Sequence, residues 1–355
     1  MNIGIDGNEA NIKNRVGSGQ YSFRILKELQ KHNIKHNFTI YLKSKPRSDM
    51  PKPNKNWQYK IIGPKPLWTK LALPLNLTFA PNKIGLFYSP THYSPSPCHI
   101  PTVPTIHDIG YLKKPDEFNK KDYYQLKNWT LQSIKQAKHI IAVSEFTKKE
   151  IIKEYKIKEN NITVIPNGIT KFKKHSKTEC QKLLLKFKIT SPYFLSVGTL
   201  KPNKNYSFLI KAFAKVPGYQ LVISGKKGWL FDEIFKTVTD LKITDKVIFT
   251  DYTTEKEKNI LYQCATATVL PSIYEGFGIP AIESQSFGTP VIVSDIPAYR
   301  EIMGTSATFI DPLNQNSLIK ALSNIKNNHS PNFKRYLWHN SAKKLLQLFD
   351  RLSNV

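Results

Sequence analysis

Short β-rich stretches alternate with helical stretches along the chain, and this alternation constrains the fold more than any other feature. In the first half the strand patterns are NIGID, NFTIYLKS, WQYKIIG, IGLFYSP, TVPTIHDIG and HIIAVSEF, and the helical patterns are QYSFRILKELQKH and KKDYYQLKNWTLQSIKQAK. Strands that alternate with helices predict a parallel, doubly wound sheet.

The alternation stops in a Lys-rich stretch at residues 170–192 and then starts again. The second series of strand patterns is YFLSVGTL, YQLVISG, KVIFTDY, ATVLPS, TPVIVSD and ATFIDP. A chain of 355 residues suits two domains of similar size. We therefore predict an α/β protein with two Rossmann-like lobes facing a cleft, at residues 1–185 and 186–335, and an amphipathic helix at 336–355 that packs back on the first lobe.

Charge is strongly basic and unevenly distributed. The chain has 53 Lys and Arg against 26 Asp and Glu, a net charge of +27, and residues 1–190 hold 34 basic and 13 acidic residues. Such a field attracts nucleic acid, anionic lipid or an acidic substrate, although a Lys-rich composition on solvated faces explains the same number. Only six of the basic residues are Arg, and none belongs to an Arg and aromatic cluster, so we expect no specific nucleic-acid site.

The cysteines indicate neither a disulfide framework nor a zinc site. Cys98, Cys180 and Cys264 are isolated, odd in number and outside any metal-ligand spacing. The N-terminus begins on a strand pattern instead of a signal peptide, and no apolar run reaches the length of a membrane span. We expect a cytoplasmic protein with reduced thiols, at most peripheral on a membrane.

The stretch PSIYEGFGIPAIES holds two carboxylates, Glu275 and Glu283, on either side of a Gly-Phe-Gly turn. The turn follows a strand and Pro280 suits the first turn of a helix, so the helix start forms an anion site that fits a diphosphate. Carboxylates on either side would then accept hydrogen bonds from sugar and ribose hydroxyls. Two alternatives stay open: a general acid and base pair, and a surface position for Glu283 on the helix.

Other candidate residues lie after neighbouring strands. VGTLKPNKNYSFL places Gly198 at a strand end and Lys204 in the loop before the next helix, and no Asp-x-Asp metal pair occurs in the chain. Lysine and helix ends would then neutralise a diphosphate. His107 follows the strand of PTIHDIG, where a purely structural role remains the alternative. RVGSGQY lacks the third glycine of a dinucleotide fingerprint, which disfavours NAD-dependent hydride transfer.

Together these segments resemble glycosyltransferase family 4, the retaining nucleotide-sugar-dependent enzymes of GT-B fold that carry the glycosyl transferases group 1 domain. YEGFGIPAIE is similar to the E-x7-E motif of that family, VGTLKPNKN to its donor-phosphate loop, and VISGKKGW to the following strand and turn. AVSEFTKKEI with VIPNGI resembles the end of its N-terminal lobe, and RVGSGQY and TIHD resemble its glycine turn and its histidine. The resemblance spans nearly the whole chain and favours the mannosyltransferase-like branch.

The resemblance implies a role for each matching residue. Glu275 would contact the transferred sugar, Glu283 the ribose, and Lys204 with the 276–279 backbone the diphosphate, while the first lobe would hold the acceptor. The implied donor-binding set is Gly17, Gly19, Gly198, Thr199, Lys204, Asn205, Gly276, Phe277, Gly278, Ile279 and Glu283, and the implied catalytic residues are His107 and Glu275. Many members carry Arg where this chain has Thr199, so neutralisation would depend more on Lys204, with Lys201.

The resemblance thus predicts a retaining hexosyltransferase without metal or cofactor. Its donor would be GDP-mannose or a UDP-hexose, with mannose favoured, and its acceptor a glycan or a lipid-linked sugar at an anionic membrane face. Two other classes remain: a non-catalytic glycan-binding or scaffolding protein on the same fold, and a basic nucleic-acid binder.

Overall fold

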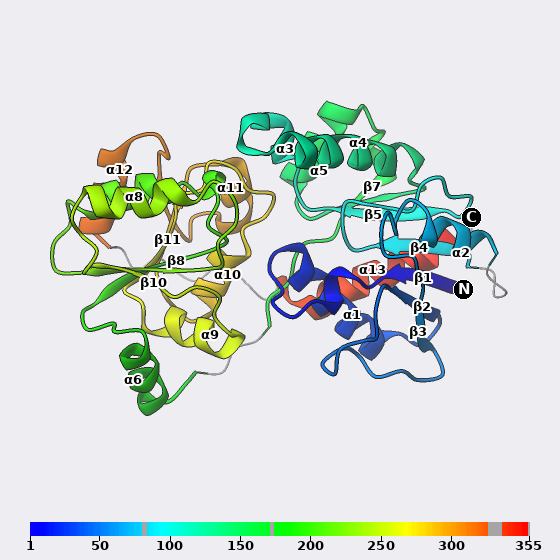
Figure 1. The fold of residues 1–355 in the computed structure, drawn as a ribbon, viewed down its shortest axis with the longest axis horizontal. Coiled ribbons are helices and arrows are strands. Elements are labelled where there is room, and N and C mark those ends of the chain that lie inside the picture. The colour runs from blue at the N-terminus through cyan, green and yellow to red at the C-terminus, as the bar shows by residue number, and fades with distance from the viewer. Residues whose placement is uncertain (80–83, 171–173, 326–335, 354–355) are drawn as a thin grey trace. The chain divides into compact units, whose positions relative to one another are not determined.

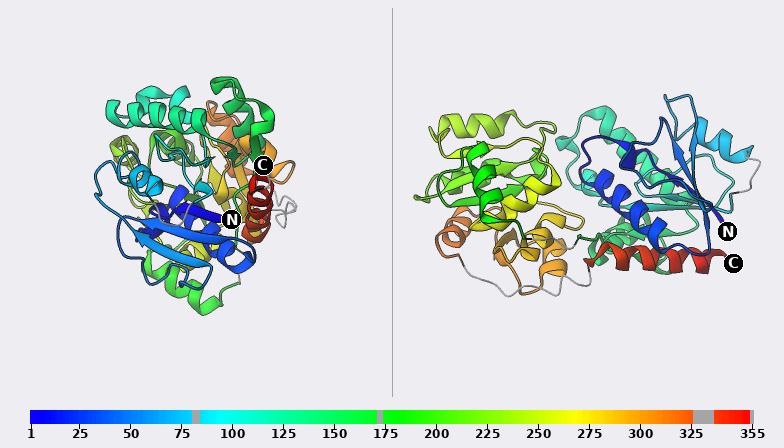
Figure 2. Two further views of the ribbon diagram at one scale, coloured as in Figure 1. Left: turned by 90° about the vertical axis from the view of Figure 1, so that its right-hand side faces the viewer. Right: turned by 90° about the horizontal axis from the view of Figure 1, so that it is seen from below.

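A computed structural model describes residues 1–79, 84–170, 174–325 and 336–353. The chain forms two compact units. The first unit comprises Met1–Gly168 and Tyr336–Val355, and the second comprises Ile169–Arg335. Each unit is a parallel sheet with helices on both faces (Figures 1 and 2).

The sheet of the first unit has seven strands in the order β3-β2-β1-β4-β5-β6-β7, paired in parallel. Its strands are β1 (Asn2–Asp6), β2 (Asn37–Leu42), β3 (Trp57–Ile61), β4 (Leu86–Ser89), β5 (Thr102–Ile106), β6 (Ile140–Ala142) and β7 (Ile162–Val164). The order reverses between β1 and β4, and ligands of such sheets bind at the strand ends beside this reversal.

Five helices and a C-terminal helix surround this sheet. They are α1 (Ser18–His32), α2 (Ala72–Thr78), α3 (Gly110–Lys113), α4 (Lys120–Gln136), α5 (Glu145–Tyr155) and α13 (Trp338–Ser353), with the 3-10 turns Glu9–Asn11, Pro115–Glu117 and Glu159–Asn161. The buried side of α13 joins the core of the first unit through Trp338, Ala342, Leu345 and Phe349. Ser341 also donates a hydrogen bond of 2.7 Å to the Pro166 carbonyl. The helix from the far end of the chain is therefore part of the first unit.

The sheet of the second unit repeats the same strand order in six strands, β10-β9-β8-β11-β12-β13. They are β8 (Tyr193–Val197), β9 (Gln220–Ser224), β10 (Val247–Phe249), β11 (Ala267–Leu270), β12 (Val291–Ser294) and β13 (Thr308–Ile310). The central strands β9, β11 and β12 are buried at every position, as expected where helices cover both faces of a parallel sheet. The predicted class, two Rossmann-like parallel sheets, is confirmed.

The helices of the second unit are α6 (Lys177–Lys186), α7 (Tyr206–Phe213), α8 (Asp232–Asp240), α9 (Glu255–Cys264), α10 (Ile279–Ser286), α11 (Pro297–Met303) and α12 (Gln315–Ser323), with a 3-10 turn at Pro202–Lys204. α6 lies within the Lys-rich stretch, and its Cys180 and Leu183 pack with Ile260 and Leu261 of α9. The two units therefore part before α6, at residue 168, and not after it.

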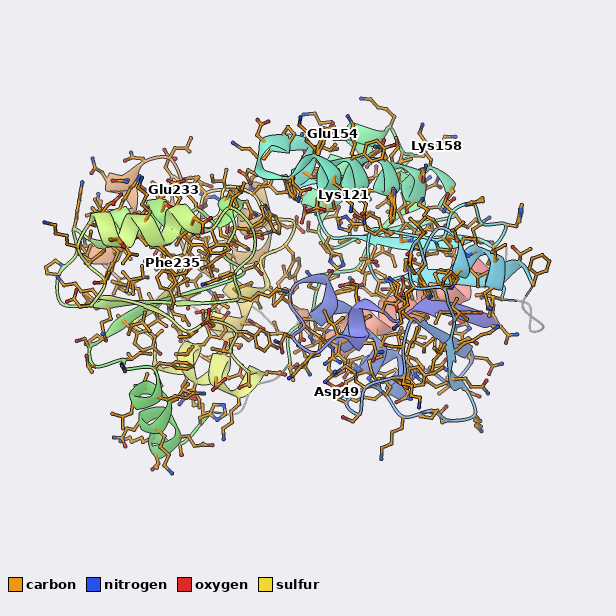
Figure 3. All side chains as sticks on the ribbon, viewed as in Figure 1. Asp49, Lys121, Glu154, Lys158, Glu233 and Phe235 are labelled. Carbon is orange, nitrogen blue, oxygen red and sulfur yellow. The ribbon has the colours of Figure 1, made fainter. Side chains whose placement is uncertain are left out.

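This assignment changes the distribution of charge. The first unit holds 30 basic and 13 acidic residues (+17) and the second holds 23 and 13 (+10). Basic side chains such as Lys121 and Lys158 are exposed (Figure 3). Asp49, labelled in the same figure, forms an ion pair with the buried Arg15, with 2.6 Å between Asp49 Oδ2 and Arg15 Nη1. Among the described residues, no helix is long and apolar enough to cross a bilayer.

Candidate active site

The loop after β11 turns sharply into α10. Gly278 caps the helix with φ +101° and α10 begins at Ile279. A methyl group on Gly278 would lie 2.5 Å from a ring carbon of Tyr299. Glycine is needed there both for the backbone conformation and for the close approach of the ring. Gly276 and Phe277 complete the turn and are buried.

Lys204 and Glu275, two of the candidate residues from the sequence, contact each other. Lys204 Nζ lies 2.5 Å from Glu275 Oε1, and the two side chains are only 16% and 13% exposed. Lys204 follows β8 and Glu275 follows β11, and these neighbouring strands flank the reversal in strand order (Figure 1). A lysine and a carboxylate therefore meet beside the amino end of α10, where parallel sheets bind ligands.

Backbone hydrogen bonds tie the two loops together. The Ile273 amide donates to the Asn203 carbonyl at 2.9 Å, and Asn203 Nδ2 donates to the Tyr274 carbonyl at 3.1 Å. Asn205 adopts the left-handed conformation with φ +57° at the start of α7, and its side chain donates to the Pro312 carbonyl at 3.0 Å. The position of Lys204 is thus fixed by its neighbours on both sides.

Gly198 and Thr199 begin the same loop in a crowded place. The Gly198 amide donates to the Ser224 carbonyl at 2.9 Å, and its own carbonyl accepts from the Tyr206 hydroxyl at 3.0 Å. A methyl group on Gly228 would lie 2.8 Å from the Thr199 methyl group. Burial raises the pKa of Tyr206, so its hydroxyl remains a donor.

Glu283 lies on α10 and has its own pair of partners on α9. Lys258 Nζ lies 2.5 Å from Glu283 Oε1, and the Tyr262 hydroxyl donates to Oε2 at 3.0 Å. Burial, and then the charge of Glu283, raise the pKa of Tyr262 well above its usual value. Glu283 is only 8% exposed, so the helix-surface alternative is wrong. Lys258 and Tyr262 were not predicted, although their spacing of four places them on one helix face.

The Tyr299 side chain lies close to the Glu275 carboxylate. Burial raises the pKa of Tyr299 well above its usual value, and the negative charge of Glu275 is the next cause. The Tyr299 hydroxyl therefore stays protonated beside the carboxylate, which favours donation of a hydrogen bond to it.

In the first unit, His107 follows β5 and contacts a second histidine. His107 Nε2 lies 2.9 Å from the Pro90 carbonyl, and its backbone amide donates to His92 Nε2 at 3.0 Å. The two rings stack with centroids 5.7 Å apart. Burial, and then the nearby His92, lower the pKa of His107 to about 4. His107 is neutral at pH 7, and the Pro90 contact assigns its proton to Nε2. His92 was not predicted.

Gly17 and Gly19 begin α1 as predicted from RVGSGQY. Gly17 caps the helix with φ +49°. A methyl group on Gly19 would lie 3.0 Å from the Glu9 carbonyl. The same helix carries Tyr21, whose ring meets the His107 ring edge-on, with the two ring centroids 4.8 Å apart. The glycine turn thus sets the start of the helix that packs against His107.

A carboxyl group with a perturbed pKa, also not predicted, ends β1. Burial raises the pKa of Asp6 to about 6, against the lowering effect of the Asn8 backbone hydrogen bond. Asn8 donates to Asp6 Oδ1 from its amide at 3.0 Å and from Nδ2 at 2.8 Å. Asp6 is therefore more easily protonated than an ordinary carboxyl group.

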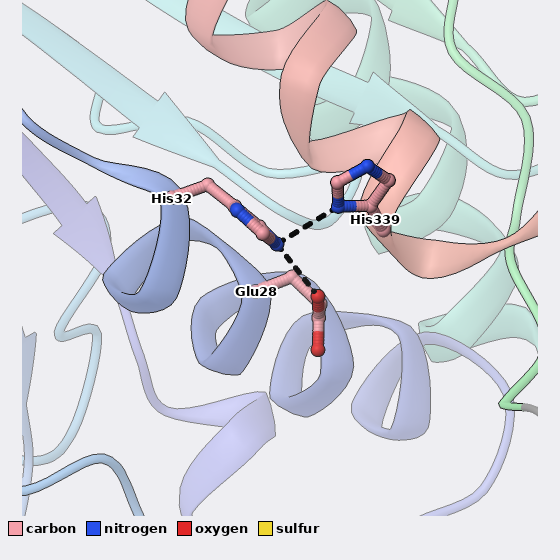
Figure 4. Close-up of side chains that lie close together, drawn as sticks. All are labelled: Glu28, His32 and His339. Carbon is pink, nitrogen blue, oxygen red and sulfur yellow. Dashed lines mark hydrogen bonds and ion pairs between the residues drawn. The ribbon is translucent and has the colours of Figure 1, made fainter.

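Among the described residues, one cluster has the side-chain types of a metal centre: Glu28 and His32 of α1 with His339 of α13 (Figure 4). His32 Nε2 lies 3.3 Å from Glu28 Oε2 and 3.0 Å from His339 Nδ1. Lys31 contacts the other oxygen of Glu28 at 2.6 Å. The Glu28 carboxylate therefore has a lysine and a histidine as partners, and His32 also contacts His339.

Two family models and several known proteins match this chain. A family model described as Glycosyltransferase Family 4 matches residues 17–171, and one described as Glycosyl transferases group 1 matches residues 177–344. The O-antigen chain mannosyltransferase RfbU of Salmonella typhimurium is 36% identical over 223 residues, 62% of this chain and 60% of that protein. The O-antigen chain mannosyltransferase B of Escherichia coli is 30% identical over 235 residues, 64% of this chain and 61% of that protein. The match covers about three fifths of the length of these relatives.

A solved structure extends the likeness of fold to the whole chain. The Anabaena protein Alr3699/HepE, solved in complex with UDP-glucose, superposes with a TM-score of 0.76 over 99% of this chain and all of that one, at 17% identity. The two family models cover nearly all of the sequence between them, and the sheets have the parallel order that the resemblance implies. The chain belongs to glycosyltransferase family 4, with a glycosyl transferases group 1 domain in its second half.

Proposed function

We propose that this chain transfers a hexose, with mannose favoured, from a nucleotide-diphosphate sugar to a glycan or lipid-linked acceptor, with retention of configuration and without a metal ion. The observation that carries the proposal is the Lys204–Glu275 contact beside the amino end of α10. A lysine and a helix start attract a diphosphate, and a neighbouring carboxylate accepts hydrogen bonds from sugar hydroxyls.

In this proposal the second unit binds the donor. Lys204 and the 276–279 backbone hold the diphosphate, Glu275 holds the sugar, and Glu283 accepts from the ribose hydroxyls. Gly198, Thr199 and Asn205 shape the loop that presents Lys204. On donor binding, the diphosphate replaces Glu275 as the partner of Lys204, which frees the carboxylate for the sugar.

The first unit supplies a neutral imidazole near the acceptor. His107 is neutral and donates its Nε2 proton to the Pro90 carbonyl, so a sugar hydroxyl would donate its hydrogen bond to Nδ1, and the ring adds no charge there. Gly17 and Gly19 allow the acceptor and phosphate to approach the start of α1. The acceptor oxygen attacks from the side of the leaving group, and the departing diphosphate takes its proton.

The choice of mannose follows from the names of the relatives, two of which are O-antigen chain mannosyltransferases. GDP-mannose is therefore the first donor to test and a UDP-hexose the second. A cytoplasmic enzyme that meets its acceptor at the membrane face fits the basic first unit.

Binding of UDP, GDP and ADP, measured as thermal stabilisation with EDTA and then with Mg²⁺, tests the donor site directly. We expect one nucleoside diphosphate to stabilise the protein equally under both conditions. Lys204→Ala should abolish this shift and lower transfer at least about 100-fold, since it removes a cation from the developing leaving group. Lys186→Ala, which removes an exposed ion pair with Glu257 in the same unit, is the matched control.

Three outcomes distinguish the alternatives. Stabilisation that needs Mg²⁺ would contradict metal independence. Donor binding without any transfer or hydrolysis would favour a glycan-binding protein on this fold. Equal activity of Lys204→Ala and Lys186→Ala would remove Lys204 from the site.

A further inference from the structure

Four large apolar side chains form an exposed stripe along one side of the segment that contains α2. Leu67, Leu71, Leu75 and Phe79 are 56%, 49%, 59% and 80% exposed. Backbone hydrogen bonds join each to the next: Leu71 N–H to Leu67 O, Leu75 N–H to Leu71 O, and Phe79 N–H to Leu75 O. Leu75 lies within α2 and Leu71 and Phe79 cap its two ends, so a spacing of four puts these three on one side of the helix. Leu67, with φ +49°, precedes the helix and is joined to it by the hydrogen bond from Leu71.

The opposite side of this segment is anchored in the first unit. Trp68, Leu73 and Leu77 are buried in a cluster with Tyr41 and Phe87 of the sheet. Trp68 Nε1 also donates to the Ile62 carbonyl at 3.1 Å. The segment therefore has two apolar sides, of which one is used by the core, and a rotation that buried the stripe would expose the tryptophan.

The sequence segment that contains the stripe has charge of one sign only. Residues 50–107 contain no Asp or Glu and six lysines: Lys52, Lys55, Lys60, Lys65, Lys70 and Lys83. Lys65 directly precedes the stripe and is exposed, and Ile61 nearby is 50% exposed. Lys70 contacts Gln132 of α4 and lies 5.2 Å from the Trp129 ring centroid, which fixes α2 to its neighbour.

We propose that this stripe, Leu67, Leu71, Leu75 and Phe79, is a membrane-docking surface that inserts into the interface of an anionic bilayer. Exposed leucines and a phenylalanine enter the boundary between headgroups and acyl chains, while lysines beside them contact lipid phosphates. A bilayer fits better than a protein groove because exposed apolar side chains and lysines occur together in a segment that, over 58 consecutive residues, supplies no carboxylate of its own to select a partner. This inference concerns where the chain works and does not depend on the identity of its donor.

The experiment measures sedimentation of the full chain with vesicles of phosphatidylcholine alone and with one third phosphatidylglycerol. We expect binding to the anionic vesicles that weakens with added salt. The double variant Leu71→Gln/Leu75→Gln should bind at least about tenfold more weakly, because two apolar side chains no longer enter the interface. Leu313→Gln, which changes a leucine of 81% exposure in the second unit, is the matched control and should bind like the parent.

Lys60→Gln/Lys65→Gln should also weaken binding to anionic vesicles and reduce its salt dependence. Nucleoside diphosphate stabilisation, measured on the same samples without lipid, should be unchanged in all variants, which separates this proposal from the donor site. Equal vesicle binding by the parent and the leucine double variant would overturn the proposal. So would self-association without lipid that the double variant abolishes, since the stripe would then be an interface between copies of the chain.

Discussion

In the second unit each candidate carboxylate contacts a lysine, whereas in the first unit burial drives the titratable groups at the strand ends toward their neutral forms. Glu275 pairs with Lys204 and Glu283 with Lys258. In contrast, the pKa of His107 is lowered to about 4 and that of Asp6 is raised to about 6. The same strand order therefore supports two kinds of candidate site, one built of paired charges and one of groups whose charged forms are disfavoured by burial.

This difference indicates that the two units, although alike in fold, are suited to different ligand groups. Paired charges hold one another in place before a ligand arrives, and a lysine in such a pair, as we propose for Lys204, can exchange its carboxylate for a phosphate. Neutral groups suit hydroxyl recognition, because an uncharged acceptor gains nothing from a buried charge that remains unpaired. The comparison predicts that the second unit responds most to changes of charge and the first unit most to pH.

The largest effect is expected from Lys258→Met. This change leaves Glu283, whose side chain is 11% exposed, without its cation, and should lower the free energy of unfolding by about 3 kcal/mol. It should also weaken donor binding. The double variant Lys258→Met/Glu283→Gln should recover most of the stability, because no buried charge is left unpaired, but should still bind donor about 10- to 100-fold more weakly. Urea unfolding and donor titration measure the two quantities.

Lys256→Met provides a control on the same helix. Lys256 contacts Glu179 at 2.6 Å, but their side chains are 62% and 39% exposed. Exposed ion pairs contribute little, so this variant should retain both stability and donor binding. If Lys258→Met also retained stability and donor binding, the second unit would not depend on paired charges and would not differ from the first unit in this respect.

In the first unit, His107→Gln should change how stability depends on pH. The cause is burial of a titratable group and not the loss of a charge partner. The folded pKa of His107, about 4, lies below the usual 6.5 of histidine, so between these values the unfolded chain binds the proton first. His107 therefore lowers stability as pH falls from about 6.5 to 4, by about 3 kcal/mol at most. Urea unfolding of the variant between pH 7.5 and 5 should show a weaker loss than the parent.

A matched comparison for this prediction is Asp6→Asn. The pKa of Asp6 is raised, so its contribution is present at low pH and is lost as pH rises through about 6, the reverse of His107. Removing Asp6 should therefore steepen the loss of stability on acidification where His107→Gln makes it shallower. The same slope in the parent and in His107→Gln would show that this histidine is not held neutral.

The sequence predicts the sheets and the positions of Lys204 and Glu275 after neighbouring strands, because both depend on local order, but it does not predict that the two side chains contact each other. Strand patterns fix the sheet class, and residues that follow neighbouring parallel strands meet at one edge. It does not predict Lys258, Tyr262 or His92. The first two act through a pairing between α9 and α10, and the third through a loop after β4. Such contacts depend on how helices and loops pack, for which a single sequence has no local signal.

The apolar segment of α2 and the Lys-rich α6 escaped prediction for a related reason. α2 is apolar on two sides, so its pattern lacks the single stripe of an ordinary surface helix. α6 buries only Cys180 and Leu183 among lysines, which resembles the composition of a linker. In both cases the tertiary contacts, and not the local pattern, decide the structure.

A change of glycine tests whether the turn before α10 is as rigid as the paired charges imply. Gly278→Ala should lower the free energy of unfolding by about 2–3 kcal/mol, because φ +101° strains any side chain and a methyl group would lie 2.5 Å from the Tyr299 ring. Gly288→Ala, with φ +79° and no atom within 4 Å of the added carbon, isolates the backbone strain and should cost only about 1 kcal/mol. Since Tyr299 lies close to Glu275, the shifted ring should also weaken donor binding in Gly278→Ala alone. Equal losses in the two variants would mean that the ring moves aside freely, and that the second unit adapts to its ligand instead of being formed in advance.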